Sequence, residues 1–137
     1  MQANDLQIAG NHYASPYQHW DFVEDALFGL YLEGQITKYV YRWRKKNGVQ
    51  DLQKSAHFAQ KLSESICAGY TSPSELNSEY GVDPTEHINR FIAENQLGSE
   101  EADIIRRIAL WRTQEDVKHA ISIIDGLISS QCIPFSS

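Results

Sequence analysis

The sequence predicts an all-α protein built as a small helical bundle. Three observations support this fold class. Apolar residues recur at the spacing of amphipathic helices, the breaks between these segments contain Gly, Pro, Asn and Ser, and the features of the first half return in the same order in the second. With 137 residues and a hydrophobic content of 42%, the chain can bury a core as one domain or as two very small ones.

Residues 1–18 contain Gly, Asn, Pro and Ser between scattered aromatic residues, which predicts an irregular N-terminal arm. We expect its His12 and Tyr13 to pack over the helices that follow. Two interpretations of His12 stay open at this point: a structural hydrogen-bonding group, or a titratable ring beside a ligand.

The first helix is predicted from about His19 to Leu30. Its inward side is predicted to consist of apolar residues, Trp20, Val23, Leu27 and Leu30 or Tyr31. Its acidic residues, Asp21, Glu24 and Asp25, suit the positive end of a helix dipole. The alternative is that one of them binds a metal ion that accompanies a phosphate.

A second helix, from about Gly34 to Lys46, carries a row of positive charge. Its apolar residues have the spacing of one buried stripe, Ile36, Tyr39, Val40 and Trp43. Lys38, Arg42 and Lys45 follow on a neighbouring stripe and define a cationic strip beside large aromatic rings. Asn47-Gly48 is typical of a helix C-cap followed by a reversal of the chain.

A third helix is predicted from about Asp51 to Ser65, and Asp51 is an acceptable N-cap or first-turn acid. Its apolar stripe is Leu52, Ala56, Phe58 or Ala59, and Leu62. Lys54 and His57 are expected to project from its side toward the cationic strip. Cations on an amphipathic helix often form only a solvated face. Here, however, the whole chain has a formal charge of −6 while half of its Lys and Arg lie between positions 38 and 54, which favours an anion-binding site.

The segment 67–82 breaks the helical periodicity and is predicted to be a linker between a first three-helix unit, 19–66, and a second, degenerate one, 83–137. Within this linker, Ser72-Pro73 followed by Glu75 is typical of a helix N-terminus with Pro at the first position.

The second unit repeats the order of features in the first, which predicts an internal duplication arranged about a pseudo-twofold axis or side by side in one bundle. The matched positions pair Glu101 with Glu33, Ile104 with Ile36, Ile108 with Val40, Trp111-Arg112 with Trp43-Arg44, Asp116 with Asp51, and Leu127 with Leu62. Chance similarity between amphipathic helices is the alternative. The cationic strip is not repeated, since Lys38 matches Arg106 but Arg42 matches Leu110. We therefore expect the second unit to support the first, or to present Arg106 and Arg107 to a shared pocket.

The runs GNHY, HWDFVE and EGQITKYVYRWRKKNGVQDLQKSAHF resemble a family of small phage-encoded proteins described as nucleotide kinases, which includes a bacteriophage T7 nucleoside monophosphate kinase without a P-loop. The resemblance covers about Gly10 to Glu64. It implies a nucleotide-binding, nucleoside monophosphate kinase-like protein of phage nucleotide metabolism, located in the cytoplasm of an infected bacterial cell. It also adds His12 and Tyr13 to the site, because the HY pair belongs to the family pattern.

Several classes of function are disfavoured. The net charge of −6 argues against general nucleic-acid binding. The two cysteines form no metal motif and no disulfide framework of the secreted type, and the chain has no signal-peptide pattern and no apolar run long enough to span a membrane. A Walker loop and the common hydrolase motifs are missing from the sequence as well.

Two hypotheses follow, and no metal-binding residue is predicted for either. In the first, Lys38 and Arg42 clamp the phosphate of a nucleotide, with Lys45 and Lys54 beside them. Tyr39, Tyr13 or His12 then stack on the base or hold the sugar, and Mg²⁺ is expected to arrive with the nucleotide.

The second hypothesis is a non-catalytic phage effector against host defence. Such a protein would sequester a nucleotide signal, or block a defence complex such as CRISPR with its acidic surface. An even-numbered homo-oligomer is expected in either case. We also expect the variant Lys38→Ala with Arg42→Ala to lose binding without losing stability.

Overall fold

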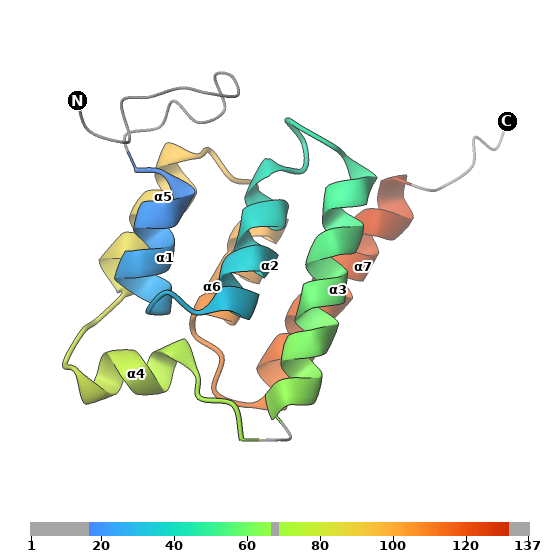
Figure 1. Cartoon of the computed structure of the whole chain (residues 1–137). Coiled ribbons are helices and arrows are strands. Elements are labelled where there is room, and N and C mark those ends of the chain that lie inside the picture. Colours follow the sequence, from blue (N-terminus) through green and yellow to red (C-terminus); the bar gives the residue numbers. More distant parts are fainter. Residues whose placement is uncertain (1–16, 67–68, 132–137) are drawn as a thin grey trace, which may run out of the picture.

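The computed structural model describes residues 17–66 and 69–131, and within these ranges all regular structure is helical. This confirms the predicted all-α bundle (Figure 1). The described helices are α1 (His19–Leu27), α2 (Tyr31–Arg42), α3 (Val49–Ile66), α4 (Pro73–Glu79), α5 (Thr85–Glu94), α6 (Ser99–Ala109) and α7 (Gln114–Gln131). None of them is long and apolar enough to cross a lipid bilayer.

The helices form two layers (Figure 1). Helices α1, α2 and α3 lie in one layer, and α5, α6 and α7 lie behind them, so that α1 contacts α5, α2 contacts α6 and α3 contacts α7. The short helix α4 crosses the end of the bundle below α1. Each helix of the first predicted unit is therefore paired with the helix that occupies the same place in the second unit.

One hydrophobic core lies between the layers and includes residues from both predicted units. Its fully buried members include Phe22, Ile36, Leu52, Leu62, Phe91, Ile104, Ile108 and Ile124. Phe22 of α1 stacks on Phe91 of α5 with ring centroids 4.4 Å apart. Burying a side chain of this size contributes about 1.5–3 kcal/mol. The two units therefore stabilise each other through a single core.

Two reciprocal hydrogen bonds cross between the layers. The indole nitrogen of Trp43 donates to Oε2 of Glu101 at 2.9 Å, and the indole nitrogen of Trp111 donates to Oε2 of Glu33, also at 2.9 Å. The matched positions of the two units pair these tryptophans with each other and these glutamates with each other. A twofold axis produces this kind of exchange: the tryptophan of each unit binds the glutamate of the other unit, and the two bonds are equivalent. The exchange supports the internal duplication, which stays a prediction.

Helix α2 begins three residues earlier than predicted and ends at Arg42 rather than Lys46. Residues 43–48 form a turn, which the Gly48 amide closes by donating to the carbonyl oxygen of Trp43 at 2.8 Å. The side chain of Asp51 accepts hydrogen bonds from the backbone and side-chain nitrogens of Asn47, both at 3.3 Å. Because these contacts end the helix early, Lys45 lies in the turn and not on the helical stripe with Lys38.

The inward side of α1 agrees with the prediction at Leu27, which is buried, but differs from it elsewhere. Phe22, Ala26 and Leu27 fill it, while Trp20 is 53% exposed and Tyr31, at the start of α2, is 63% exposed. The reason is that α1 packs through Phe22 against α5, which rotates Trp20 to the outer face. Tyr39, predicted in the buried stripe, is half-buried, whereas Ile36, Val40 and Trp43 are buried as predicted.

The predicted linker contains the helix α4, which begins as its sequence indicated. Ser72 is the N-cap, its hydroxyl accepts from the Glu75 amide at 3.0 Å, and Pro73 occupies the first turn. Asn77 donates to the carbonyl oxygen of Ala26 at 2.9 Å. This bond attaches the segment to α1, so the segment packs on the bundle.

Candidate anion-binding site

Four predicted site residues come together around one aromatic ring. The Lys38 ammonium lies 5.4 Å, the Arg42 guanidinium carbon 4.7 Å and the Lys54 ammonium 5.3 Å from the centroid of Tyr39. Tyr39 in turn stacks on Phe58 of α3, with centroids 6.0 Å apart and an interplanar angle of 3°. We call Lys38, Tyr39, Arg42 and Lys54 the Tyr39 cluster.

The cluster is positioned by the hairpin of α2 and α3. Lys38 and Arg42 lie one helical turn apart on α2, and the charged groups of both reach the Tyr39 ring. Across the hairpin, the hydroxyl of Ser55 donates to the carbonyl oxygen of Ile36 at 3.0 Å, and both groups are buried. This bond fixes the register of the two helices and places Lys54 beside the Tyr39 ring.

Arg42 differs from the two lysines because it is buried and already paired. Only 7% of the residue is exposed, and its Nε lies 3.4 Å from Oδ2 of the fully buried Asp51. The charge of Arg42 is therefore largely balanced inside the protein. This changes the expectation that Arg42→Ala leaves stability unaffected, since the substitution would leave a buried carboxylate without its cation.

Lys38 and Lys54 form no ion pair with any residue in the described ranges. Other cations of the described chain do have acidic partners, namely Arg44, Arg90, Arg107 and Lys118. Two like charges near one ring repel each other, and weak cation–π contacts of about 0.5–1 kcal/mol offset this only in part. An anion placed between them would be held by both.

The face around the cluster is hollowed. A cleft of about 600 Å³ between α1 and α2 is lined by His19, Trp20, Tyr31 and Lys38 among others. A second hollow of about 480 Å³ is lined by Tyr39, Lys54, His57 and Phe58, with Gln50 and Gln53. We call these the α1–α2 cleft and the α3 hollow. Lys38 lines the first and reaches the Tyr39 ring of the second, so it connects them.

A third, smaller hollow of about 370 Å³ continues along the same face, lined by Tyr31, His57, Phe58 and residues of α3. The residues that line these three hollows all come from positions 19–64. Arg107 contacts Asp103 and His119 instead. Neither Arg106 nor Arg107 lines any of these three hollows, so the hollows do not support the predicted pocket shared between the two units.

His19 is an aromatic group of the α1–α2 cleft that the sequence did not single out. Its ring stacks on Tyr41 with centroids 5.3 Å apart, and its Nε2 lies 2.8 Å from the hydroxyl oxygen of Thr37. Burial, together with the positive charges of Lys38 and Arg42, lowers the pKa of His19 to about 3. The imidazole is therefore neutral at physiological pH and adds no positive charge to the site.

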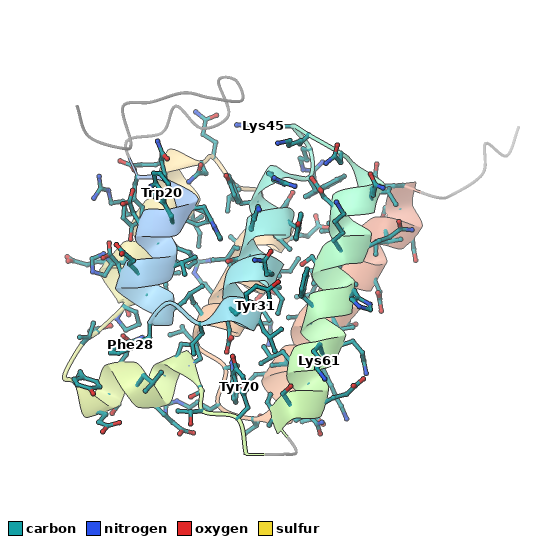
Figure 2. All side chains as sticks on the ribbon, viewed as in Figure 1. Trp20, Phe28, Tyr31, Lys45, Lys61 and Tyr70 are labelled. Carbon is teal, nitrogen blue, oxygen red and sulfur yellow. The ribbon has the colours of Figure 1, made fainter. Side chains whose placement is uncertain are left out.

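Other predicted site residues lie apart from the cluster or outside the described ranges. Lys45 is exposed in the turn after α2, at the far end of the hairpin from Tyr31 (Figure 2). His12 and Tyr13 lie outside the described residues. Sequence reasoning missed Trp20 and Tyr31 as surface residues of the cleft. Their helical spacing gave no usable signal, because it fits a buried stripe equally well.

Within the described residues, no group of three or more His, Cys, Asp or Glu side chains is arranged to hold a metal ion. Asp21 and Glu24, which the sequence offered as acids beside a phosphate, both line the α1–α2 cleft with Lys38. A hydrated Mg²⁺ that arrived with a nucleotide in this cleft would meet these two carboxylates.

Fold and site together define a small all-α protein with a cation-rich aromatic surface on one face. Over residues 9–60, less than half of the chain, the sequence is similar to a family described as proteins of unknown function, DUF3310. This stretch includes the whole Tyr39 cluster. No curated protein and no solved structure matches the chain.

Proposed function

We propose that this protein binds a nucleotide, or a closely related small molecule that bears a phosphate, at the Tyr39 cluster. The observation that carries the proposal is the convergence of Lys38 and Lys54 on one ring, without acidic partners among the described residues, in a chain with a net charge of −6. The resemblance to phage-encoded nucleotide kinases supports the choice of ligand and a place in the cytoplasm of the infected cell.

The charge of the site favours a single terminal phosphate. Because Asp51 balances Arg42, two ammonium groups of the Tyr39 cluster remain without an acidic partner among the described residues. Their charge matches the charge of about −1.5 to −2 that a phosphate monoester carries at pH 7. Lysine ammonium groups act here as point charges rather than as a bidentate fork. A nucleoside monophosphate is therefore the ligand of best charge match.

The enzymatic form of the proposal is a nucleoside monophosphate kinase-like reaction. The site would hold the acceptor, and the transfer of a phosphoryl group from a nucleoside triphosphate would depend on positioning and charge neutralisation. A donor adds several negative charges that two lysines do not balance. Mg²⁺ bound to the donor would have to supply the rest of the positive charge.

The second candidate function is a non-catalytic effector against host defence. The small number of unpaired cations favours it, because sequestering a nucleotide signal needs a binding site but no donor site. Blocking a defence complex, such as a CRISPR complex, needs only the acidic surface that a net charge of −6 provides.

A thermal-shift screen tests the proposal with nucleoside mono-, di- and triphosphates and cyclic nucleotides, each with and without Mg²⁺. Binding to the folded state alone adds about 2.7 kcal/mol at a ligand concentration of 100 Kd, so a specific ligand raises Tm by several degrees. We expect the monophosphates to give this shift. An assay for the formation of a nucleoside diphosphate from a monophosphate and a triphosphate would then distinguish the two functions, because only a kinase forms this product.

The variant Lys38→Ala with Lys54→Ala should lose the shift, while the Tm of the free protein changes little because neither lysine is buried or ion-paired within the described chain. Lys118→Ala is the matched control, since this exposed lysine lies on α7. A shift that survives in the double lysine variant would contradict the site, and no shift with any nucleotide would favour the defence-blocking function.

A further inference from the structure

We propose that the α1–α2 cleft is the nucleoside subsite of the same site, in which the base stacks on Trp20 and His19 accepts a hydrogen bond from the nucleoside. This inference rests on the proposed function, since it assumes that the phosphate of the ligand lies at the Tyr39 cluster. It adds where the rest of the ligand lies and which residues recognise it.

The cleft and the cluster are contiguous through one residue. Lys38 lines the cleft and its ammonium also lies 5.4 Å from the Tyr39 centroid. A ligand with its phosphate at Lys38 and Lys54 would therefore cross α2 at Lys38 to enter the cleft. The cleft volume of about 600 Å³ falls within the range of about 300–1,000 Å³ that small-molecule sites occupy.

Trp20 provides the stacking surface. It is 53% exposed although it is the largest apolar side chain on α1, and it lines the cleft beside His19. Trp20 lies at the upper end of α1, whereas Tyr31 lies low on α2 in the same view (Figure 2). Stacking of a base on an aromatic side chain contributes about 1–3 kcal/mol and tolerates every base.

The hydrogen bonds of Thr37 fix the tautomer of His19. The Thr37 hydroxyl has one hydrogen, and the backbone carbonyl oxygens of Glu33 and Gly34 lie within 3.0 and 3.2 Å to accept it. Toward His19 the same oxygen can then only accept, so Nε2 of His19 carries the ring hydrogen and donates it at 2.8 Å.

This assignment leaves Nδ1 of His19 with a lone pair, and the ring cannot easily turn because it stacks on Tyr41. A neutral imidazole with an unprotonated Nδ1 is a poor ligand for a phosphate but a good acceptor for an N–H group of a base or a hydroxyl group of a sugar. His19 therefore suits the nucleoside and not the phosphate, which separates its role from that of the lysines.

The test compares probes that share a phosphate and differ in the rest: inorganic phosphate, ribose 5-phosphate, and the monophosphates AMP, GMP, CMP and UMP. We expect the nucleoside monophosphates to bind at least about tenfold more tightly than ribose 5-phosphate. Trp20→Ala should remove this difference and leave the binding of ribose 5-phosphate unchanged. Tyr80→Ala is the matched control, because Tyr80 is 66% exposed at the C-terminal end of α4 and does not line the cleft. It should change neither the affinity for the nucleoside monophosphates nor that for ribose 5-phosphate.

The wild-type protein gives an independent reading of His19 by ¹⁵N NMR. The ring should show the Nε2–H tautomer when free, and a nucleoside monophosphate should shift the Nδ1 resonance toward a hydrogen-bonded value without protonating it. Inorganic phosphate should leave that resonance in place. This measurement does not depend on whether a His19→Phe variant folds.

Three outcomes overturn the inference; the first two concern the subsite alone and the third concerns the proposed function. If ribose 5-phosphate binds as tightly as the nucleoside monophosphates, or if Trp20→Ala weakens all probes equally, the nucleoside subsite is wrong while the phosphate site stands. If no phosphate-bearing probe binds at all, the proposed function itself fails, and the subsite fails with it.

Discussion

At the scale of single residues, Arg42 and Lys38 show how neighbouring cations on one helix acquire different roles. Both lie against Tyr39, but only Arg42 is buried and ion-paired with a buried carboxylate. Asp51 also accepts two hydrogen bonds from Asn47, so it links Arg42 to the turn that ends α2. Arg42 therefore shapes the site, and Lys38 is available to a ligand.

The first prediction concerns this ion pair. Arg42→Ala should reduce the free energy of unfolding by about 3 kcal/mol, because it leaves Asp51 charged and buried without its partner. Urea denaturation measures the loss. Lys38→Ala is the control and should change stability by less than about 0.5 kcal/mol. Adding Asp51→Asn to Arg42→Ala should restore part of the loss, and equal losses in the Arg42 and Lys38 variants would contradict the structural role.

Glu33 and Glu101 are matched buried carboxylates with opposite electrostatics. Burial raises the pKa of Glu33, which accepts hydrogen bonds from Trp111 and Tyr70 but has no cation beside it among the described residues. Burial acts in the same direction on Glu101, but hydrogen bonds from Arg44, from its own backbone and from Trp43 outweigh it and lower the pKa of Glu101. Arg44 Nε lies 2.6 Å from Glu101 Oε2.

The second prediction follows from these two directions. Because the pKa of Glu33 is higher in the folded state than in the unfolded state, its protonated form stabilises the fold. This contribution to the free energy of unfolding is fully present below the unfolded pKa and is lost as the pH rises through the folded pKa. Glu33→Gln should therefore gain stability relative to the wild type between about pH 4 and about pH 7. Its amide can keep both contacts, accepting from Trp111 and donating to the Tyr70 oxygen.

Glu101 has the opposite pH dependence. Because its pKa is lower in the folded state, ionised Glu101 adds to the free energy of unfolding above the unfolded pKa, and this contribution is lost as the pH falls through the folded pKa. Glu101→Gln should therefore destabilise the protein at neutral pH, and the difference from the wild type should shrink toward about pH 3. Urea denaturation across this pH range checks both variants. The same pH trend in the two variants would show that the matched glutamates are not electrostatically distinct.

At the scale of elements, the turn between α2 and α3 determines which cations reach the Tyr39 ring. Gly48 adopts a φ of 60°, in the left-handed region, and its amide closes the turn on Trp43. The early end of α2 removes Lys45 from the helical stripe, while the Ser55 hydrogen bond brings Lys54 across from α3. The site is therefore a property of the hairpin and not of α2 alone.

The third prediction compares two glycines. Gly48→Ala should cost about 1 kcal/mol, because an L-residue is strained at a positive φ even though open space surrounds the site. Gly126→Ala, within the exposed part of α7 and also with open space around it, should stabilise the protein by about 0.5–1 kcal/mol. Thermal and urea unfolding measure both. Gly48→Ala should also weaken ligand binding, whereas Gly126→Ala should not.

At the scale of the whole molecule, the two layers bring each helix of one unit onto its counterpart in the other, with the Trp–Glu exchange between them. Such a chain resembles a dimer of three-helix units joined by the segment that contains α4. The predicted internal duplication pairs core positions of like character, such as Ile36 with Ile104, but it pairs the cationic residues Lys38 and Arg42 with Arg106 and Leu110. A further homo-oligomer of the whole chain stays a prediction.

The fourth prediction is the binding stoichiometry. Arg107 is engaged by Asp103 and His119, and the position that matches Arg42 is a leucine. The described residues of the second predicted unit therefore provide no counterpart of the Tyr39 cluster. Isothermal titration calorimetry should therefore find one nucleotide per chain. Arg106→Ala with Arg107→Ala should leave the affinity unchanged, and two equivalent sites per chain would contradict the asymmetry of the units.

Much of the architecture could be predicted from local patterns. The period of the apolar residues indicated an all-α bundle and the burial of Ile36, Val40 and Trp43, and Ser72-Pro73 indicated the start of α4. These features depend on residues a few positions apart, so the backbone geometry of a helix is enough to infer them. Lys38 and Arg42 were predicted on one stripe for the same reason, whereas Lys54 reaches the Tyr39 ring from α3 because of the register of the hairpin.

Long-range packing governed the remaining features. Trp20 lies outside the core because Phe22 occupies the contact with Phe91, and Arg42 is paired because a turn places Asp51 beside it. The Trp111–Glu33 bond joins residues 78 positions apart. Periodicity identifies an apolar face but not the neighbour that covers it, and charge alone does not reveal which cation meets a carboxylate. Those outcomes depend on how the two layers pack, since burial and pairing are properties of contacts between distant parts of the chain.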